Sequence, residues 1–229
     1  MCGRFTLTKT AKEVEKRFEA RFEGGNYKRT YNASPGNVLP VITGEQPDSL
    51  RHFRWGLVPG WAKDAAIGYK TINARVETIA EKPAFKFAFQ RQRCLVPADS
   101  YYEWKASGKE KIPWRIMLKG GPLFAFAGLW EQWKNLENNE TLHSFTIITR
   151  PAVHRVAHLH DRMPVILSRI NEQLWLDTEL PQEDLEKLLQ PVNEKDLDFY
   201  TVSQRVNKTE NDTPDLVKPH KYNVQGSLF

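Results

Sequence analysis

The sequence predicts an α+β fold, in which a single β-rich domain forms a curved mixed sheet or an irregular barrel with peripheral helices. Most apolar stretches are short, rich in β-branched and aromatic residues, and bounded by glycine or proline, which is typical of strands. Only a few segments carry the periodicity of a helix. The 229 residues are 40% hydrophobic and 27% charged, a globular composition. We expect one domain over residues 1–229, with a core over about 1–207 and a polar tail over 208–229.

The first predicted element is a helix from about Thr10 to Phe22. Thr10 and Glu13 have the spacing of a capping box, which begins a helix. Val14, Phe18 and Phe22 recur every four residues and would share one apolar face. Shorter helices are expected at 83–90, 152–158, 171–176 and 181–189.

The remaining apolar stretches predict strands. A polar segment over 134–142, with Asn138–Asn139 at its centre, predicts an exposed hairpin tip between two of them. The expected strands are 38–42, 52–58, 93–96, 114–118, 123–129, 144–148, 163–167 and 199–202.

Charge and cysteine content limit the classes of protein. The net charge of +5 favours polyanionic partners only modestly. Two cysteines, Cys2 and Cys94, make a poor disulfide framework for a chain of this length, which fits a reducing cytoplasm. The sequence has no apolar run of about 18 residues and no apolar leader near Met1, so we expect a cytoplasmic monomer without a membrane span.

Cys2 is the residue with the most distinctive chemistry. Removal of Met1, which requires a small second residue, would give Cys2 a free α-amine next to its thiol. Such an aminothiol reacts with aldehydes: the amine forms an imine, and the sulfur closes a thiazolidine ring in a step favoured by proximity. An α-amine, with a pKa of about 8, is also more often unprotonated at neutral pH than a lysine amine. Taken alone, Cys2 is better explained as a small residue near a frayed end.

Further motifs follow Cys2 in a fixed order along the chain. They are Met1–Phe5, Tyr31–Pro35, Arg54–Trp61, Ile72–Thr78, Arg93–Trp104, Ala127–Trp130, Thr146–Thr149 and His160–Pro164. With these motifs the sequence resembles the SRAP (SOS response-associated peptidase) family of abasic site processing proteins. The resemblance covers residues 1–164 and includes every polar position that the family pattern requires.

The resemblance implies a covalent trap for abasic sites in single-stranded DNA, which would shield the site through a thiazolidine at Cys2. Glu103 would transfer protons at the amine and the imine, and its aromatic neighbours would raise its pKa by desolvation. His160, with an ordinary pKa of about 6.5, would promote opening of the sugar ring. Asn73 would hold the Cys2 amine and the sugar hydroxyl, since an amide both donates and accepts. Without the resemblance, Glu103 is better explained as a solvated strand glutamate, and the ordinary explanations of His160 and Asn73 are a structural histidine and an asparagine in turns.

The same resemblance implies secondary activities and DNA contacts. Lyase cleavage, cross-link reversal and self-release of Met1 would use the same groups, and no cofactor is expected. Guanidinium groups pair with phosphate oxygens, and indole rings stack on bases. The expected DNA-contact residues are Arg4, Arg75, Arg162, Trp61, Trp104, Thr149, Pro35 and Pro40.

Three other interpretations stay open. His154, His158 and His160 have a spacing that could bind zinc, although no cysteine lies nearby. Cys2 could be the N-terminal nucleophile of an amidohydrolase, with its own amine as base. The chain could also bind single-stranded DNA without any covalent step.

Overall fold

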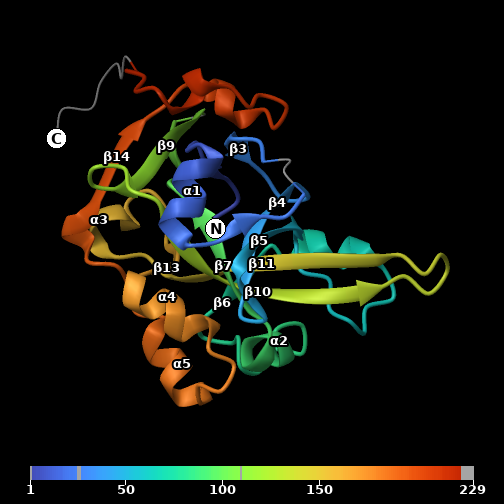
Figure 1. Ribbon diagram of the computed structural model, residues 1–229. Helices are drawn as coiled ribbons and strands as arrows, with labels where there is room; N and C mark the ends of the chain where they lie inside the picture. Colours follow the sequence, from blue (N-terminus) through green and yellow to red (C-terminus); the bar gives the residue numbers. More distant parts are fainter. Residues whose placement is uncertain (1, 25–26, 109, 223–229) are drawn as a thin grey trace.

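The centre of the protein is a closed barrel of five strands (Figure 1). The computed structural model describes residues 2–24, 27–108 and 110–222. The strand order is β11-β10-β7-β4-β5, and β5 pairs with β11 to close the ring. That closing pair is parallel and the other pairs are antiparallel, so the barrel is mixed, which confirms the predicted α+β class. Its strands are β4 (Val38–Thr43), β5 (Gln46–Trp55), β7 (Arg93–Ala98), β10 (Phe124–Lys134) and β11 (Thr141–Pro151).

A second, antiparallel sheet lies against the barrel and carries the N-terminal strand. Its order is β14-β9-β8-β1-β3, which places β1 between β3 and β8. These strands are β1 (Phe5–Leu7), β3 (Thr30–Ala33), β8 (Ser100–Ser107), β9 (Glu110–Leu118) and β14 (Leu197–Thr201). Short strands extend the barrel: β2 (Arg21–Phe22), β6 (Asn73–Arg75), β12 (Arg162–Pro164) and β13 (Ile166–Leu167).

The barrel strands are apolar on both faces because each face has its own core. In β10, Phe124 and Phe126 belong to an inner cluster that takes alternate residues from all five barrel strands. The intervening Ala125 and Ala127 belong to an outer cluster, which also contains buried residues of the helices. Successive side chains of a strand point to opposite faces, so this division follows from the strand itself.

Four of the described helices cover the outside of the barrel (Figure 1): α1 (Ala11–Phe18), α2 (Lys86–Arg91), α4 (Arg169–Leu176) and α5 (Gln182–Leu188). The short helix α3 (His154–Ala157) instead packs on the inner cluster through Val156. The first predicted helix is too long at its C-terminal end. Glu19 takes the left-handed conformation with φ of 55°, and Arg21–Phe22 then pairs with β5 as a strand. The capping box is confirmed, since the Glu13 amide donates to Thr10 Oγ1 at 3.3 Å and the Thr10 amide donates to Glu13 Oε2 at 2.7 Å.

Thr10→Ala is expected to lower the free energy of unfolding by about 1 kcal/mol, because it leaves an amide of the first turn of α1 without its acceptor. Thr10→Ser keeps that acceptor and is the matched control. Urea unfolding of both variants measures the effect. Equal stability of the alanine variant and the wild type would show that the capping box contributes nothing.

Each predicted strand overlaps an observed one, but β2 and β6 were not predicted, nor were the longer or more central β1, β3 and β8. Their apolar runs are short and interrupted by polar residues such as Thr6, Asn32 and Ser100, all of which are buried and hydrogen-bonded. The predicted hairpin tip is confirmed: residues 135–140 connect β10 to β11, and the hairpin projects from the body (Figure 1).

The segment from residue 208 to residue 222 is polar, but it packs against the rest of the protein. Asp212 Oδ1 accepts hydrogen bonds from the amides of Tyr31 and Asn32, both in β3. Asn32 Nδ2 in turn donates to the carbonyl of Asn211 at 2.7 Å. Leu216 is fully buried beside Tyr102.

Among the described helices, none has the length and apolar character needed to cross a membrane.

Candidate functional site

Cys2 lies inside the protein, just before β1. Its side chain is fully buried in the inner cluster, which also contains Tyr101 and Phe126. Burial raises the pKa of the Cys2 thiol well above its usual range, and the negative charge of Glu103 adds to this rise. The thiol is therefore protonated at neutral pH. Loss of its proton would place a negative charge on the sulfur that is repelled by the charge of Glu103.

A buried polar network holds β1, and with it Cys2, in register with β8. The Thr6 hydroxyl donates to Asp99 Oδ1, and the amide and hydroxyl of Thr8 both lie 2.6 Å from Asp99 Oδ2. Arg115 adds a salt bridge to Asp99 at 3.4 Å and a hydrogen bond to the Ser100 hydroxyl at 2.8 Å. Buried charges need such partners, so the network orients β1, the strand that follows Cys2.

Glu103 lies on β8 and faces the same side as Tyr101, since residues two apart in a strand share a face. It is only 3% exposed, and burial raises its pKa from 4.5 to about 7. The negative charge of Asp161 also raises this pKa, so the His160–Asp161 turn lies near the carboxyl group. A carboxyl group with this pKa is present in both protonation states at neutral pH and can donate or accept a proton.

His160 lies in the turn between α3 and β12. Burial lowers its pKa below 6.5, so the neutral ring predominates at neutral pH. In the neutral ring, Nδ1 accepts a hydrogen bond from the Arg162 amide at 2.9 Å. When the ring is protonated, the same nitrogen can pair with Asp161 Oδ1, which lies 2.7 Å away. The ring therefore has a defined partner in each protonation state.

Asn73 begins β6, which runs parallel to β11. A loop returns the chain to this position: the Leu57 amide donates to the Thr71 carbonyl, and the Thr71 hydroxyl donates to the Leu57 carbonyl at 2.5 Å. Asn73 Nδ2 donates to the carbonyls of Ile72 and Ile147, and Ile147 belongs to the same inner cluster as Cys2. Asn73 Oδ1 is buried and has no hydrogen-bond partner among the described residues, so it can accept one from a bound group.

The three candidate arginines differ in what already binds them. Arg4 donates to the Asn32 side chain and to two backbone carbonyls, and it lies over the Trp104 ring at 5.9 Å. Arg162 forms a two-pronged ion pair with Glu77 and donates to the Thr149 carbonyl at 2.7 Å. Arg75 is exposed. Of the three, Arg75 is therefore best placed for a phosphate.

The other DNA-contact candidates are dispersed. Trp61 is 62% exposed, whereas Trp104 is half-buried and donates to Asn207 Oδ1 at 2.7 Å. Pro35 is half-buried. Thr149 and Pro40 are buried, so they are not on the surface that a DNA strand would reach in this structure.

The zinc interpretation has no support in the part of the chain that the structure describes, where no three histidine, cysteine or acidic residues form a group that could hold a metal ion. His158 instead packs against Trp114 and Phe199. His160 is engaged by the Arg162 amide.

Two buried groups were missed by sequence reasoning. The hydroxyl of Tyr101 has no hydrogen-bond partner among the described residues, and Glu131 on β10 is only 8% exposed, with burial raising its pKa to about 7. The two-residue spacing from Glu103 could have placed Tyr101 at the site. No local pattern marks Glu131.

Comparisons with known proteins identify the family of this chain. A family model described as "SOS response associated peptidase (SRAP)" matches residues 1–209. The abasic site processing protein YoqW of Bacillus subtilis is 45% identical over 225 residues, which cover 96% of this chain and all of the relative. The abasic site processing protein HMCES of Xenopus tropicalis is 32% identical, covering 95% of this chain and 78% of the relative.

A crystal structure of a protein from Bacteroides thetaiotaomicron superposes with a TM-score of 0.89 at 29% sequence identity. The superposition covers 96% of this chain and 100% of the other. The family model matches most of the chain, the relative from Bacillus subtilis aligns along nearly its full length, and the solved structure has the same fold. This chain therefore belongs to the SRAP family.

Proposed function

We propose that this protein processes abasic sites in single-stranded DNA, and that it does so by forming a thiazolidine between Cys2 and the sugar. One observation carries the mechanism: the Cys2 thiol and a carboxyl group with a pKa of about 7, Glu103, are buried together and interact electrostatically. The names of the relatives, abasic site processing proteins, supply the substrate class.

The first stage is formation of an imine. Removal of Met1 makes the Cys2 nitrogen the terminal amine, which attacks the C1′ aldehyde of the open abasic sugar. Glu103 accepts a proton from the attacking amine and then donates one to the departing hydroxyl, which leaves as water. His160 assists the opening of the sugar ring, and Asn73 Oδ1 accepts a hydrogen bond from the amine or a sugar hydroxyl.

The second stage is closure of the ring. The thiol adds across the C=N bond, so that sulfur bonds to C1′ and its proton ends on nitrogen. Because thiol and amine belong to one residue, this closure is intramolecular and traps the imine. If the imine instead loses a C2′ proton, the 3′ phosphate departs and the strand is cleaved, which would be the lyase activity.

Two further activities belong to the same proposal. Glu103 can return a proton to the thiazolidine nitrogen, which would reopen the ring and reverse the cross-link. Self-release of Met1 would be the peptidase activity to which the family name refers. Both reactions need proton transfer at the Cys2 nitrogen, which Glu103, whose charge acts on the Cys2 thiol, would supply.

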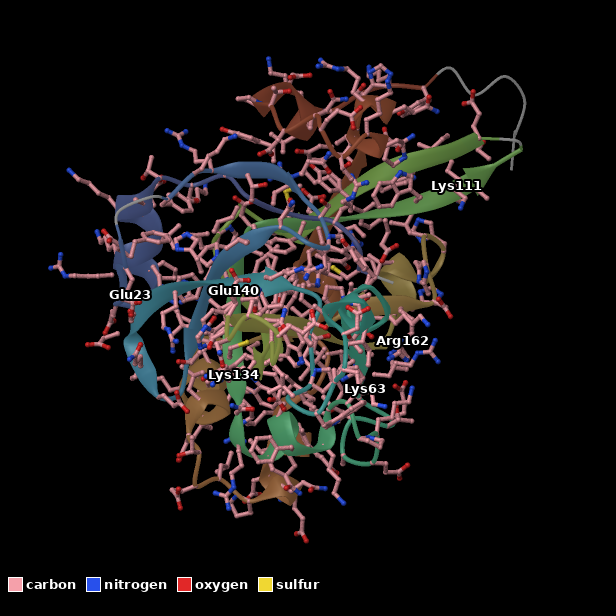
Figure 2. All side chains as sticks on the ribbon, turned by 90° about the vertical axis from the view of Figure 1, so that its right-hand side faces the viewer. Glu23, Lys63, Lys111, Lys134, Glu140 and Arg162 are labelled. Atoms are coloured by element: carbon pink, nitrogen blue, oxygen red, sulfur yellow. The ribbon has the colours of Figure 1, made fainter. Side chains whose placement is uncertain are left out.

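Basic side chains provide a path for the DNA backbone. In the view of Figure 2, Lys63 and Lys111 lie on the same side of the molecule as Arg162, whose guanidinium is bound to Glu77. Arg75 is exposed in β6, and the two strands β6 and β12 both pair with β11. Trp61, exposed between β5 and β6, can stack on a base near the abasic nucleotide.

Mass spectrometry of the intact protein, combined with denaturing gels, tests the proposal. After incubation with abasic single-stranded DNA, the chain should lack Met1, gain the mass of the oligonucleotide less water, and stay attached through boiling in detergent. A chain with an uncleaved N-terminal tag should not cross-link, because its Cys2 nitrogen is an amide. If wild type forms no adduct, the covalent mechanism is wrong. Non-covalent retention would then favour a binding module, and ammonia release from amides would favour an amidohydrolase.

Arg75→Ala is expected to weaken binding of abasic single-stranded DNA and to lower the slope of log affinity against log salt by about 1, because one phosphate contact is lost. Arg21→Ala, which removes an exposed arginine from β2, is the control. Fluorescence anisotropy over a salt series measures both slopes. An unchanged slope for Arg75→Ala would remove this residue from the phosphate contacts.

A further inference from the structure

Tyr101 is a buried phenol in the same inner cluster as the Cys2 thiol. Its side chain is 0% exposed, and its ring meets that of Phe126 edge-on at 6.3 Å between centroids. The hydroxyl has no hydrogen-bond partner among the described residues. Buried hydroxyls in native proteins are nearly always hydrogen-bonded, so this one needs an explanation.

Tyr101 shares a face of β8 with Glu103 and pairs across the sheet with Phe5, three residues after Cys2. Burial raises the pKa of Tyr101 well above its usual range, and negative charge on Cys2, followed by that on Glu103, raises it further. The phenol therefore stays protonated and remains a donor throughout the neutral range. Of the two charges, the one on the Cys2 sulfur has the larger effect.

The Cys2 sulfur needs a hydrogen-bond donor when its thiol loses the proton. It is fully buried, and loss of its proton would place negative charge on sulfur in an apolar cluster that includes Phe5 and Phe126. A buried anion is costly unless a donor stabilises it. A donor in the same buried cluster could stabilise this charge as it develops on the sulfur.

We propose that the Tyr101 hydroxyl donates a hydrogen bond to the Cys2 sulfur during thiazolidine closure, and that it thereby favours cross-linking over strand cleavage. This inference rests on the proposed function. In the closing step the S–H bond breaks, the S–C1′ bond forms, and the π electron pair of the imine takes up the proton at nitrogen. No oxidant or reductant takes part. The hydrogen bond from Tyr101 stabilises the sulfur while its proton departs.

The competing reaction of the same imine makes this role measurable. Loss of the C2′ proton and departure of the 3′ phosphate do not involve the sulfur. A slower closure therefore lengthens the lifetime of the imine and increases the share of cleaved DNA. The ratio of cross-linked to cleaved strand reports on the sulfur step, whereas a general loss of DNA binding would lower both products together.

Tyr101→Phe removes only the hydroxyl oxygen. Because that oxygen makes no hydrogen bond to a described residue, thermal unfolding of the variant should be at or above the wild-type temperature. On end-labelled abasic single-stranded DNA, the ratio of cross-linked to cleaved product should fall by about tenfold or more, the effect of one hydrogen bond to a charged group.

Tyr102→Phe is the matched control. Tyr102 is the neighbouring buried tyrosine, it faces the opposite side of β8, and its hydroxyl donates to the Tyr31 carbonyl at 2.9 Å. This variant should lose some stability, because it leaves that carbonyl without its donor, and should keep the wild-type product ratio.

A second readout needs no DNA. Titration of the thiolate by its ultraviolet absorbance should give a higher Cys2 pKa in Tyr101→Phe than in wild type. If wild type cross-links while Tyr101→Phe keeps both the product ratio and the thiol pKa, the role of Tyr101 is refuted and the proposed function stands. An equal fall in ratio for both tyrosine variants would also refute it. Absence of any wild-type adduct would instead refute the proposed function.

Discussion

Cys2→Ala is expected to lower the yield of cross-link that survives denaturation by at least about 100-fold, because the sulfur that traps the imine is gone. The new terminal residue still carries an α-amine, so imine formation and strand cleavage should continue. Borohydride reduction should then convert this imine into a stable adduct and restore the shifted band. Denaturing gels with and without reduction measure both effects.

Cys94→Ala is the control, because Cys94 is the only other cysteine of the chain. It is also fully buried in the inner cluster, on β7, where loss of its sulfur affects packing. The variant should be somewhat less stable and should cross-link like wild type. An equal cross-link yield for Cys2→Ala and wild type without borohydride would mean that another side chain is the nucleophile.

Glu103→Gln is expected to slow cross-linking by about 100-fold or more while largely sparing DNA affinity, because an amide cannot exchange protons with the amine and the hydroxyl. In wild type the rate should change with pH around the Glu103 pKa of about 7. That inflection should be absent from the variant. Single-turnover rates from pH 5 to 9 measure the profile, and equal losses of rate and affinity would contradict proton transfer.

The same substitution has an expected effect on stability. The folded-state pKa of Glu103 is raised above the unfolded value of 4.5, so the folded state holds this proton more tightly. Stability due to this group is therefore present below pH 4.5 and is lost as pH rises through about 7. The stability advantage of Glu103→Gln over wild type should be larger at pH 8 than at pH 4 by about 3 kcal/mol.

Glu131→Gln separates the effect of a buried carboxyl group on stability from the effect of Glu103 on the cross-linking rate. Burial also raises the pKa of Glu131 to about 7, but this residue lies on β10, pairs with Ser144 and is assigned no role in the reaction. Its variant should show the same direction of pH-dependent stability and a wild-type cross-linking rate. A slow Glu131→Gln variant would show that buried charge in general, rather than the position of Glu103, controls the reaction.

Much of the fold could be predicted because local rules determine its elements. The Thr10 capping box starts α1 where expected, and the short apolar run over 123–129 was readable as a strand, although β10 continues to Lys134. The end of α1 was not readable, because the pairing of Arg21–Phe22 with β5 is a contact between distant parts of the chain. The closure of β5 onto β11 is likewise long-range, so the barrel could be named only as one of two options.

The sequence by itself determined the chemistry, because it depends on residue type: an amine and a thiol on Cys2, a carboxyl group at Glu103 and an imidazole at His160. Only the tertiary structure decided how each group behaves. The depth of Glu103 sets its pKa, the ion pair with Glu77 occupies Arg162, and burial removes Thr149 from the surface. These properties come from desolvation and from contacts between residues far apart in the chain, and no local pattern encodes them.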